Sequence, residues 1–219
     1  MTHLRLSDKN IKPAVINLVA GSLKIGQVIV IPTDTLYGFS CLADNAPAIR
    51  RIKQLKKSDP KKPLLVLVNN LAMLKKYVFV SPRQAALLKK YWASGARPTT
   101  VILKHRGRLP QELTGDSDGL AVRLPKSKFL TKILEAVKVP IVSTSLNLGG
   151  QASISDLKLL MHHFPKKKYR PDLVVDTGKC RRIKPSRLID LRPAGGPLVI
   201  RKKIYEYEYE EAEKIFYRK

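Results

Sequence analysis

Short apolar runs alternate along this chain with segments of helical periodicity, and this alternation constrains the fold more than any other feature. Residues 11–25 carry apolar side chains at helical spacing, and residues 27–31 follow as a β-branched run. A helical segment followed by an apolar run recurs, with the helix at residues 46–57 and the run at residues 64–68. The run at 64–68 is apolar throughout, as expected of a strand buried on both faces. Further helices are expected at 82–92, 127–137 and near 154–163, and further strands at 99–103, 119–124, 139–142, 173–175, 187–191 and 198–201.

Interleaved helices and strands predict an α/β (α+β) protein with a mixed, twisted sheet flanked by helices. The chain has 219 residues, of which 44% are hydrophobic, enough for a single domain with a sizeable core. We assign residues 1–204 to this domain and residues 205–219 to a C-terminal tail. Residues 205–211 alternate with period two and then turn acidic, which is compatible with an edge strand or a peripheral tail.

The charge of the chain favours a polyanionic partner. It has 42 Lys and Arg against 17 Asp and Glu, a formal net charge of +25, which creates a field that attracts RNA, DNA or nucleotides. Residues 166–203 hold 13 Lys and Arg and only three acids. A concentrated basic stripe is typical of a nucleic-acid-binding surface, whereas a basic surface without a partner is the simpler alternative.

Cysteine usage and the N-terminus predict a cytoplasmic protein with no membrane partner. Cys41 and Cys180 are too few for a disulfide framework or a zinc site, so we expect reduced thiols. The first residues lack the apolar core of a signal peptide, and no apolar run approaches the roughly 20 residues of a membrane span.

Several common catalytic motifs are absent from the sequence. It has no P-loop, no dinucleotide-binding glycine motif, no H-E-x-x-H or C-x-x-C pair, and no nucleophile elbow. The four histidines have no ligand-like spacing, so we expect no protein-bound metal. Hydroxyl groups and cations remain at the ends of the predicted strands. They suit a reaction that depends on positioning and charge neutralisation, and we assign no catalytic nucleophile.

Six segments follow one another in a recognisable order over about residues 10–201. They are VIPTDTLYG (30–38), KKSDPKKPLLVLV (56–68), RPTTVIL (97–103), GLAVRLP (119–125), STSLNLGG (143–150), and the closing pair PSRLIDL (185–191) and LVIRK (198–202). Together they resemble the YrdC/YciO family of threonylcarbamoyl-AMP synthases. Two departures from the family pattern stand out: Ser58 occupies the position of an arginine, and Arg97 that of a glycine.

The resemblance implies a YrdC-like fold with a concave, positively charged cavity. In that cavity a nucleotidyltransferase reaction would convert L-threonine, bicarbonate and ATP, with Mg²⁺, into threonylcarbamoyl-AMP and pyrophosphate. Partner transferase proteins would use the product to modify tRNA. By family position, the residues that bind threonine would be Thr33, Arg123, Thr144 and Ser186, and those that bind the nucleotide would be Lys56, Ser58, Lys62, Ser145, Asn147, Ser153 and Arg201.

Purely structural roles are open for several of these positions. Thr35, Tyr37, Ser143 and Asn147 are of types that cap turns. Lys61 and Lys62 are equally compatible with a solvated face. Arg123 differs, because a charge within an apolar strand requires a partner or a ligand.

A second hypothesis belongs to a different functional class. The +25 charge and Ser58 are compatible with a non-catalytic, YciO-like protein that binds tRNA or double-stranded RNA through its basic surface. A third and weaker hypothesis is a carbamoyl-adenylate role of the kind this fold has inside hydrogenase-maturation proteins. The sequence lacks the zinc-finger and acylphosphatase-like segments that flank the fold there.

Overall fold

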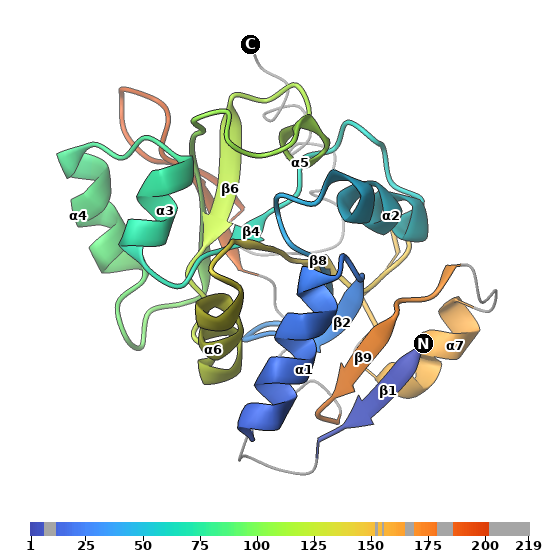
Figure 1. The fold of residues 1–219 in the computed structure, drawn as a ribbon. Helices are drawn as coiled ribbons and strands as arrows, with labels where there is room; N and C mark the ends of the chain where they lie inside the picture. Colours follow the sequence, from blue (N-terminus) through green and yellow to red (C-terminus); the bar gives the residue numbers. More distant parts are fainter. Residues whose placement is uncertain (7–11, 152, 155, 165–168, 179–185, 202–219) are drawn as a thin grey trace.

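The strands are divided between two mixed sheets with helices packed against them (Figure 1). The computed structural model describes residues 1–6, 12–151, 153–154, 156–164, 169–178 and 186–201. The expected mixed α/β class is confirmed, with two sheets taking the place of one. The five-stranded sheet has the order β1 (Thr2–Arg5), β9 (Leu173–Asp176), β2 (Ile29–Pro32), β3 (Tyr37–Ser40) and β8 (Thr144–Ser145). The six-stranded sheet has the order β11 (Leu198–Arg201), β10 (Arg187–Asp190), β5 (Thr99–Lys104), β6 (Gly119–Arg123), β4 (Val66–Leu67) and β7 (Ile141–Val142).

Most of the longer helices begin at a polar side chain that caps the first turn. Asn45, Asn70 and Ser81 each accept a hydrogen bond from the backbone N–H three residues on, and Ser81 forms a capping box with Gln84. No helix in the part of the chain described is long and apolar enough to cross a membrane. The helices are α1 (Pro13–Lys24), α2 (Ala46–Lys56), α3 (Leu71–Tyr77), α4 (Pro82–Tyr91), α5 (Gln111–Thr114), α6 (Lys128–Val137), the 3₁₀ turn η1 (Leu157–Leu159) and α7 (Leu160–His163).

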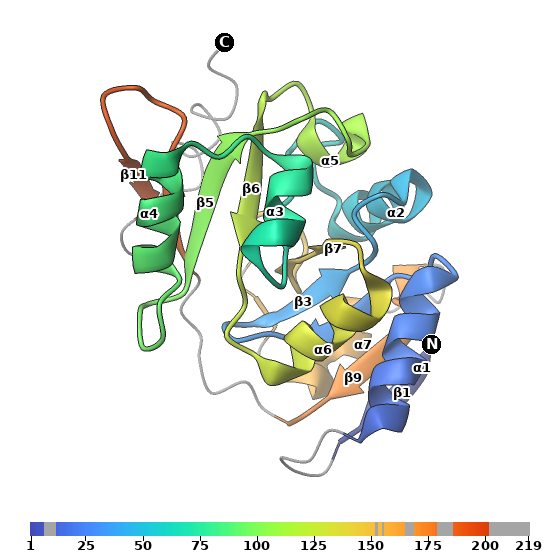
Figure 2. The ribbon, with the colours of Figure 1, turned by 60° about the vertical axis from the view of Figure 1, so that its left-hand side comes forward.

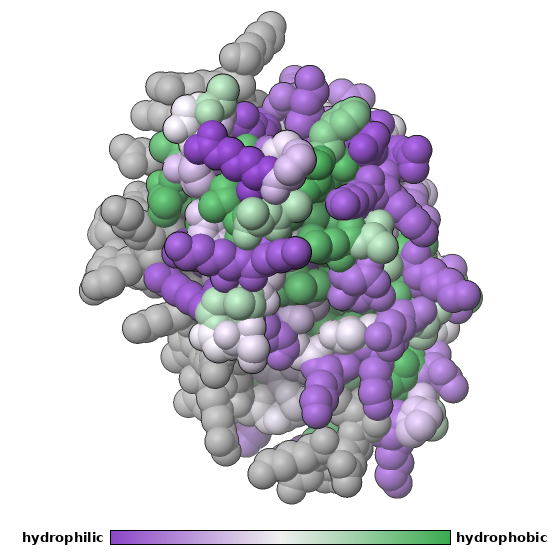
Figure 3. All heavy atoms as spheres, turned by 90° about the vertical axis from the view of Figure 1, so that its left-hand side faces the viewer, coloured by the Kyte–Doolittle hydropathy of each residue, from purple (hydrophilic) through white to green (hydrophobic). Residues whose placement is uncertain are grey.

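The two faces of the six-stranded sheet have different surroundings. Side chains alternate along a strand, so Val101 and Leu103 of β5 join the main core, whereas Ile102 belongs to a small separate cluster with Ala121 and Leu188. Helices α3 and α4 lie in front of β5 and β6 in Figure 2, over the core face. Figure 3 views the side of the molecule that carries these helices and shows many hydrophilic side chains around smaller hydrophobic areas. The face opposite to α3 and α4 remains available for a cavity.

Backbone hydrogen bonds join the two sheets. Strand β3 continues into Cys41 and Leu42, whose backbone contacts β7: Val142 N donates to Cys41 O at 2.9 Å, and Leu42 forms an isolated bridge with Ile141. Ser143 N donates to Leu65 O at 3.0 Å. The segment after β7 is therefore fixed between the sheets, where it leads into β8.

Cys41 is fully buried, and burial raises the pKa of its thiol, with a smaller contribution from the charge of Asp44. It is a free thiol, as expected for the reduced state. Cys180 and residues 205–219 lie outside the described residues.

Five elements were not predicted: β1, β3, β8, α3 and α5. Strand β3 matters most, because it forms an antiparallel hairpin with β2. Gly38 pairs with Ile31 and Tyr37 with Pro32, so the polar turn between the strands covers only residues 33–36. The helix expected near 154–163 begins only at Leu157, as a 3₁₀ turn.

Gly38 is required by a close backbone contact between β3 and β8. A Cβ atom at this position would lie 2.8 Å from the carbonyl oxygen of Thr144. We expect Gly38→Ala to lower the free energy of unfolding by roughly 1–3 kcal/mol, because β8 must move to accept the methyl group. Urea denaturation measures this change.

Gly21 provides the matched control. It lies exposed in α1, and no atom comes within 4 Å of an added Cβ. Gly21→Ala should stabilise the protein by roughly 0.5–1 kcal/mol. Equal effects of the two substitutions would show that β3 and β8 do not approach each other as described.

Candidate functional site

A cavity with both polar and apolar walls lies against the open face of the six-stranded sheet, beside the β2–β3 turn and the end of α2. Its volume of about 210 Å³ exceeds that of several water molecules at about 30 Å³ each, so it has room for a small ligand. All of the predicted ligand-binding residues except Ser153 and Arg201 line it. The lining includes Thr33, Thr35, Lys56, Ser58, Lys62, Thr100, Ala121, Arg123, Ser143, Thr144, Ser145, Asn147, Ser186 and Leu188.

The two remaining predicted residues have other positions. Ser153 is partly exposed and is not among the described residues of the cavity wall. Arg201 ends β11, with its backbone opposite Leu188, and its side chain lies outside the part of the chain described.

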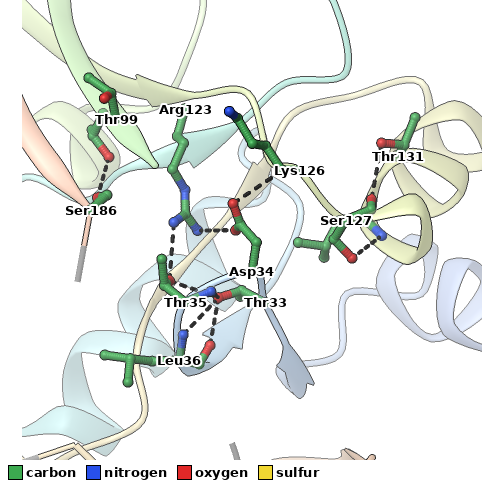
Figure 4. Close-up of polar contacts among 12 residues, drawn as sticks. Thr33, Asp34, Thr35, Leu36, Thr99, Arg123, Lys126, Ser127, Thr131 and Ser186 are labelled. Carbon is green, nitrogen blue, oxygen red and sulfur yellow. Dashed lines mark hydrogen bonds and ion pairs between the residues drawn. The ribbon is translucent and has the colours of Figure 1, made fainter. Parts of the chain in front are cut away.

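Arg123 projects from β6 into the space between the sheets and is 3% exposed (Figure 4). Its Nη2 atom lies 3.3 Å from Oδ1 of Asp34, which is also buried, and its Nη1 donates to Thr35 Oγ1 at 3.1 Å. Burial lowers the pKa of Arg123, and the charge of Asp34 opposes this effect. Nε of Arg123 has no hydrogen-bond partner among the described residues. The guanidinium is thus held in place, and its Nε donor is buried without a partner among the described residues.

The β2–β3 turn is built around the hydroxyl of Thr33. This hydroxyl donates to Leu36 O at 2.6 Å and accepts from the N–H groups of Thr35 and Leu36, each at 3.1 Å. Its hydrogen and both lone pairs are therefore engaged within the turn. Asp34 also holds the turn, since its Oδ2 accepts from Lys126 N at 3.1 Å. Thr33 lines the cavity but offers a ligand mainly its methyl group and backbone.

Lys56, at the end of α2, binds the segment that follows β8. Its ammonium donates to Ser145 O at 2.5 Å, to Asn147 O at 3.2 Å and to Asn147 Oδ1. Its carbonyl oxygen accepts from Gly149 N at 2.6 Å. These contacts use all three hydrogens of the ammonium. Lys56 therefore acts on any ligand through its charge and through the loop that it positions.

The residues that line the cavity give it a positive potential. Lys56, Lys62 and Arg123 contribute cations, and none of the described lining residues is acidic. Burial, with a further contribution from Lys62, lowers the pKa of Lys56 from 10.5 to about 7. A nearby anionic ligand would favour its protonated form. The cavity is therefore suited to carboxylates and phosphates.

Three further residues add hydroxyl groups to the wall. Ser186 Oγ and Thr100 Oγ1 lie 2.8 Å apart, on neighbouring strands β10 and β5, and both are buried. Ser58 follows the left-handed Lys57 at the end of α2, and its backbone N–H donates to Lys53 O at 3.0 Å. The serine places a short, uncharged side chain at this part of the wall.

Some residues of the site were missed from the sequence, and the partner of Arg123 is the most important. A charge in an apolar strand indicates that Arg123 has a buried partner or a ligand, but it does not identify Asp34 as that partner. Thr100, Ala121 and Leu188 were also missed. Their positions follow from strand alternation once Arg123 and Ser186 are known to face the cavity.

The basic stripe expected over 166–203 lies largely outside the described residues. Those of its side chains that are described bind protein groups. Arg170 donates to Phe164 O at 2.9 Å, and Arg192 pairs with Asp190 and Asp118. Arg187 lies over the ring of Tyr91 at 5.0 Å.

The fold and the site define a class: a mixed α/β protein with a cationic, hydroxyl-lined cavity beside the junction of two sheets. The family model Sua5_yciO_yrdC, described as "Telomere recombination", matches residues 22–203. The chain belongs to the Sua5/YciO/YrdC family.

Relatives and solved structures agree with this assignment. A threonylcarbamoyl-AMP synthase of Pyrococcus abyssi is 29% identical over 193 residues, which are 84% of this chain and 55% of that protein. The crystal structure of P. abyssi Sua5 complexed with L-threonine superposes with a TM-score of 0.80 at 27% identity, over 92% of this chain and 57% of that chain. E. coli YciO also gives a TM-score of 0.80, at 26% identity, over 93% of this chain and 97% of that one. This chain thus spans little more than half the length of the Pyrococcus relative.

The buried Asp34–Arg123 pair leads to a stability prediction. Asp34→Asn keeps the shape of the side chain but leaves the buried guanidinium without its counter-charge. We expect it to lower the free energy of unfolding by about 3 kcal/mol. Chemical denaturation of the variant and of the parent protein measures the loss.

Asp116 supplies a matched control for the same chemical change. It lies 3.4 Å from Lys61 on the surface, where both side chains are more than half exposed. Asp116→Asn should cost less than about 1 kcal/mol. If the two substitutions had equally small effects, the Asp34–Arg123 pair would not be the constraint described here.

Proposed function

We propose that the cavity binds L-threonine and ATP and converts them, with bicarbonate, into threonylcarbamoyl-AMP and pyrophosphate. The observation that carries the proposal is the buried guanidinium of Arg123, held by Asp34 and surrounded by hydroxyl groups. Support comes from the Pyrococcus relative named threonylcarbamoyl-AMP synthase and from the Sua5 structure complexed with L-threonine. The product would supply a transferase that modifies tRNA.

Arg123 is proposed to bind the carboxylate of threonine. Its Nε has no partner among the described residues, and a guanidinium pairs with a carboxylate through two parallel hydrogen bonds. The hydroxyls of Thr144, Ser145 and Ser186 line the same space and are suited to the amine and hydroxyl of the amino acid. Ala121 and Leu188 provide an apolar surface for its methyl group.

The proposed reaction has two bond-forming steps. The threonine amine loses a proton and attacks the carbon of bicarbonate, and water leaves to give a carbamate. A carbamate oxygen then attacks the α-phosphorus of ATP, and the bond to pyrophosphate breaks. The protein contributes by aligning the carbamate with the phosphate and by limiting its contact with water.

Positive charge near the phosphates comes from Lys62 and Lys56. Lys62 lines the cavity close enough to Lys56 to lower its pKa. Lys56 already uses its hydrogens on the loop, so we assign it long-range charge neutralisation and loop positioning. Ser58, at the family's arginine position, adds no charge, and the two lysines carry this role. Ser145 and Asn147, which Lys56 orders, would contact the nucleotide.

Mg²⁺ is expected to accompany ATP and would neutralise phosphate charge. Among the described residues, no group of three or more His, Cys, Asp or Glu is arranged to hold a metal ion. The amide oxygen of Asn147 already accepts from the Lys56 ammonium and from the Ser145 hydroxyl. The wall therefore fits an ion held by phosphate oxygens and water and not by the protein.

The assay for this proposal is pyrophosphate release with each substrate omitted in turn. The full-length chain should release pyrophosphate only when L-threonine, bicarbonate and ATP are all present. Arg123→Lys should raise the KM for threonine by roughly tenfold or more, because lysine keeps the charge but loses the two-pronged contact. The KM for ATP should change little.

Two results would contradict the proposal. A well-folded parent protein without threonine-dependent turnover would favour the non-catalytic alternative. Equal increases in both KM values for Arg123→Lys would indicate general damage to the cavity, and circular dichroism of the variant checks its fold.

A further inference from the structure

A long acid-free stretch of the sequence supplies part of the side of the molecule opposite to the cavity. Residues 60–111 contain 11 Lys and Arg and no Asp or Glu. This stretch includes α3 and α4, which cover the core face of the six-stranded sheet (Figure 2). The cavity lies against the other face, so ligands on the two sides would not compete for space.

Backbone contacts gather part of this charge into one surface, which we call the basic face. Phe79 N donates to Lys104 O at 2.9 Å, and Arg106 N donates to Tyr77 O at 2.8 Å. The end of α3 is thereby joined to the segment after β5. The basic face consists of six exposed residues: Lys75, Lys76, Phe79, Lys104, Arg106 and Arg108.

The cations of the basic face have no acidic partners. Among the described residues, no carboxylate lies within ion-pair distance of any of the five. Three acids in the adjoining segment are already paired: Glu112 with Arg50, Asp116 with Lys61, and Asp118 with Arg192. Burial raises the pKa of the Tyr77 hydroxyl, and the exposed Asp44 lies near enough to raise it further, an effect that Arg108 opposes. The five cations leave an excess of positive charge, which raises the local concentration of polyanions.

Phe79 makes the surface more specific than a solvated lysine cluster. It is 48% exposed, although it is a large aromatic residue. The guanidinium of Arg106 lies 4.1 Å from its ring centroid, and Arg106 Nε is fixed by a 3.0 Å hydrogen bond to Val78 O. Exposed aromatic rings and arginine planes are the groups on which unpaired bases stack, while lysines beside them hold the phosphates.

We propose that the basic face binds nucleic acid with unpaired bases, with phosphates on its lysines and arginines and a base on the Phe79–Arg106 pair. An acidic peptide would match the charge but would give no role to the exposed ring. The proposal is independent of the synthase activity, because no residue of the basic face lines the cavity. It also differs from the expectation of binding through residues 166–203.

The first test measures how salt weakens the binding of an RNA hairpin with an unpaired loop. Lys75→Ala/Lys76→Ala should weaken binding and reduce the slope of log K against log salt concentration by about 1.4, at roughly 0.7 per phosphate contact. The matched control is Lys128→Ala/Lys132→Ala, which removes two exposed lysines from α6. An equal loss in the control would show diffuse attraction to the net charge and would overturn the proposal.

The second test isolates stacking. Phe79→Leu keeps an apolar side chain and should weaken hairpin binding by roughly tenfold, with little effect on fully paired RNA of the same length. An unchanged hairpin affinity would overturn the proposal, as would undetectable binding of the parent protein at low salt. L-Threonine binding should be the same in all of these variants, so failure here is distinguishable from failure of the proposed function.

Discussion

The structure depends on one buried ion pair that joins its two sheets. Arg123 comes from β6 of the six-stranded sheet, and Asp34 comes from the turn that links β2 to β3 of the five-stranded sheet. Removing two charges from water costs several kcal/mol for each ion, so such a pair is weak evidence for extra stability. Its value here is geometric, because it sets the turn against the sheet and holds a cation at the wall of the cavity. The synthase proposal rests on this fixed guanidinium.

The hydrogen bonds of Lys56 fix another part of the cavity wall. Lys56 ends α2 and binds both the backbone and a side chain of residues 145–147, while its own carbonyl oxygen receives the N–H of Gly149. Because its ammonium hydrogens are all bound within the protein, Lys56 acts on a ligand only through its charge and through the loop that it positions. Burial lowers the pKa of Lys56. A bound anion therefore favours the protonated form of Lys56, and protonated Lys56 in turn strengthens the binding of the anion. The binding of an anionic ligand and the order of the loop are therefore linked through one side chain.

Much of the fold could be predicted from the sequence, because local periodicity indicates which residues are buried. The strand at 119–123 and the helix at 128–137 could be located within a residue or two from their apolar patterns. Strand β3 could not, since a glycine beside a polar turn also resembles a turn end, and only the pairing with β2 and β8 identifies it. Contacts between distant residues are equally hidden. The acid at 34 and the arginine at 123 are each conspicuous, but nothing in the sequence says that they meet.

The residues that line the cavity were predicted mainly from the family resemblance, which gives their identities and order. The resemblance does not give their hydrogen bonds. The hydroxyl of Thr33 binds within its own turn, and the ammonium of Lys56 binds the loop after β8. The basic face was missed because its cations are spread over about thirty residues, and a contact between α3 and the segment after β5 gathers them.

The central claim is that Arg123 receives the carboxylate of threonine. The most direct measurement follows the Nε–H resonance of Arg123 by ¹⁵N NMR, assigned by its absence in Arg123→Lys, during titration with L-threonine and with L-threoninol, which lacks the carboxylate. We expect a saturable shift with L-threonine and none with L-threoninol at the same concentrations. Binding of L-threonine that leaves this resonance unmoved, or equal shifts with both compounds, would contradict it.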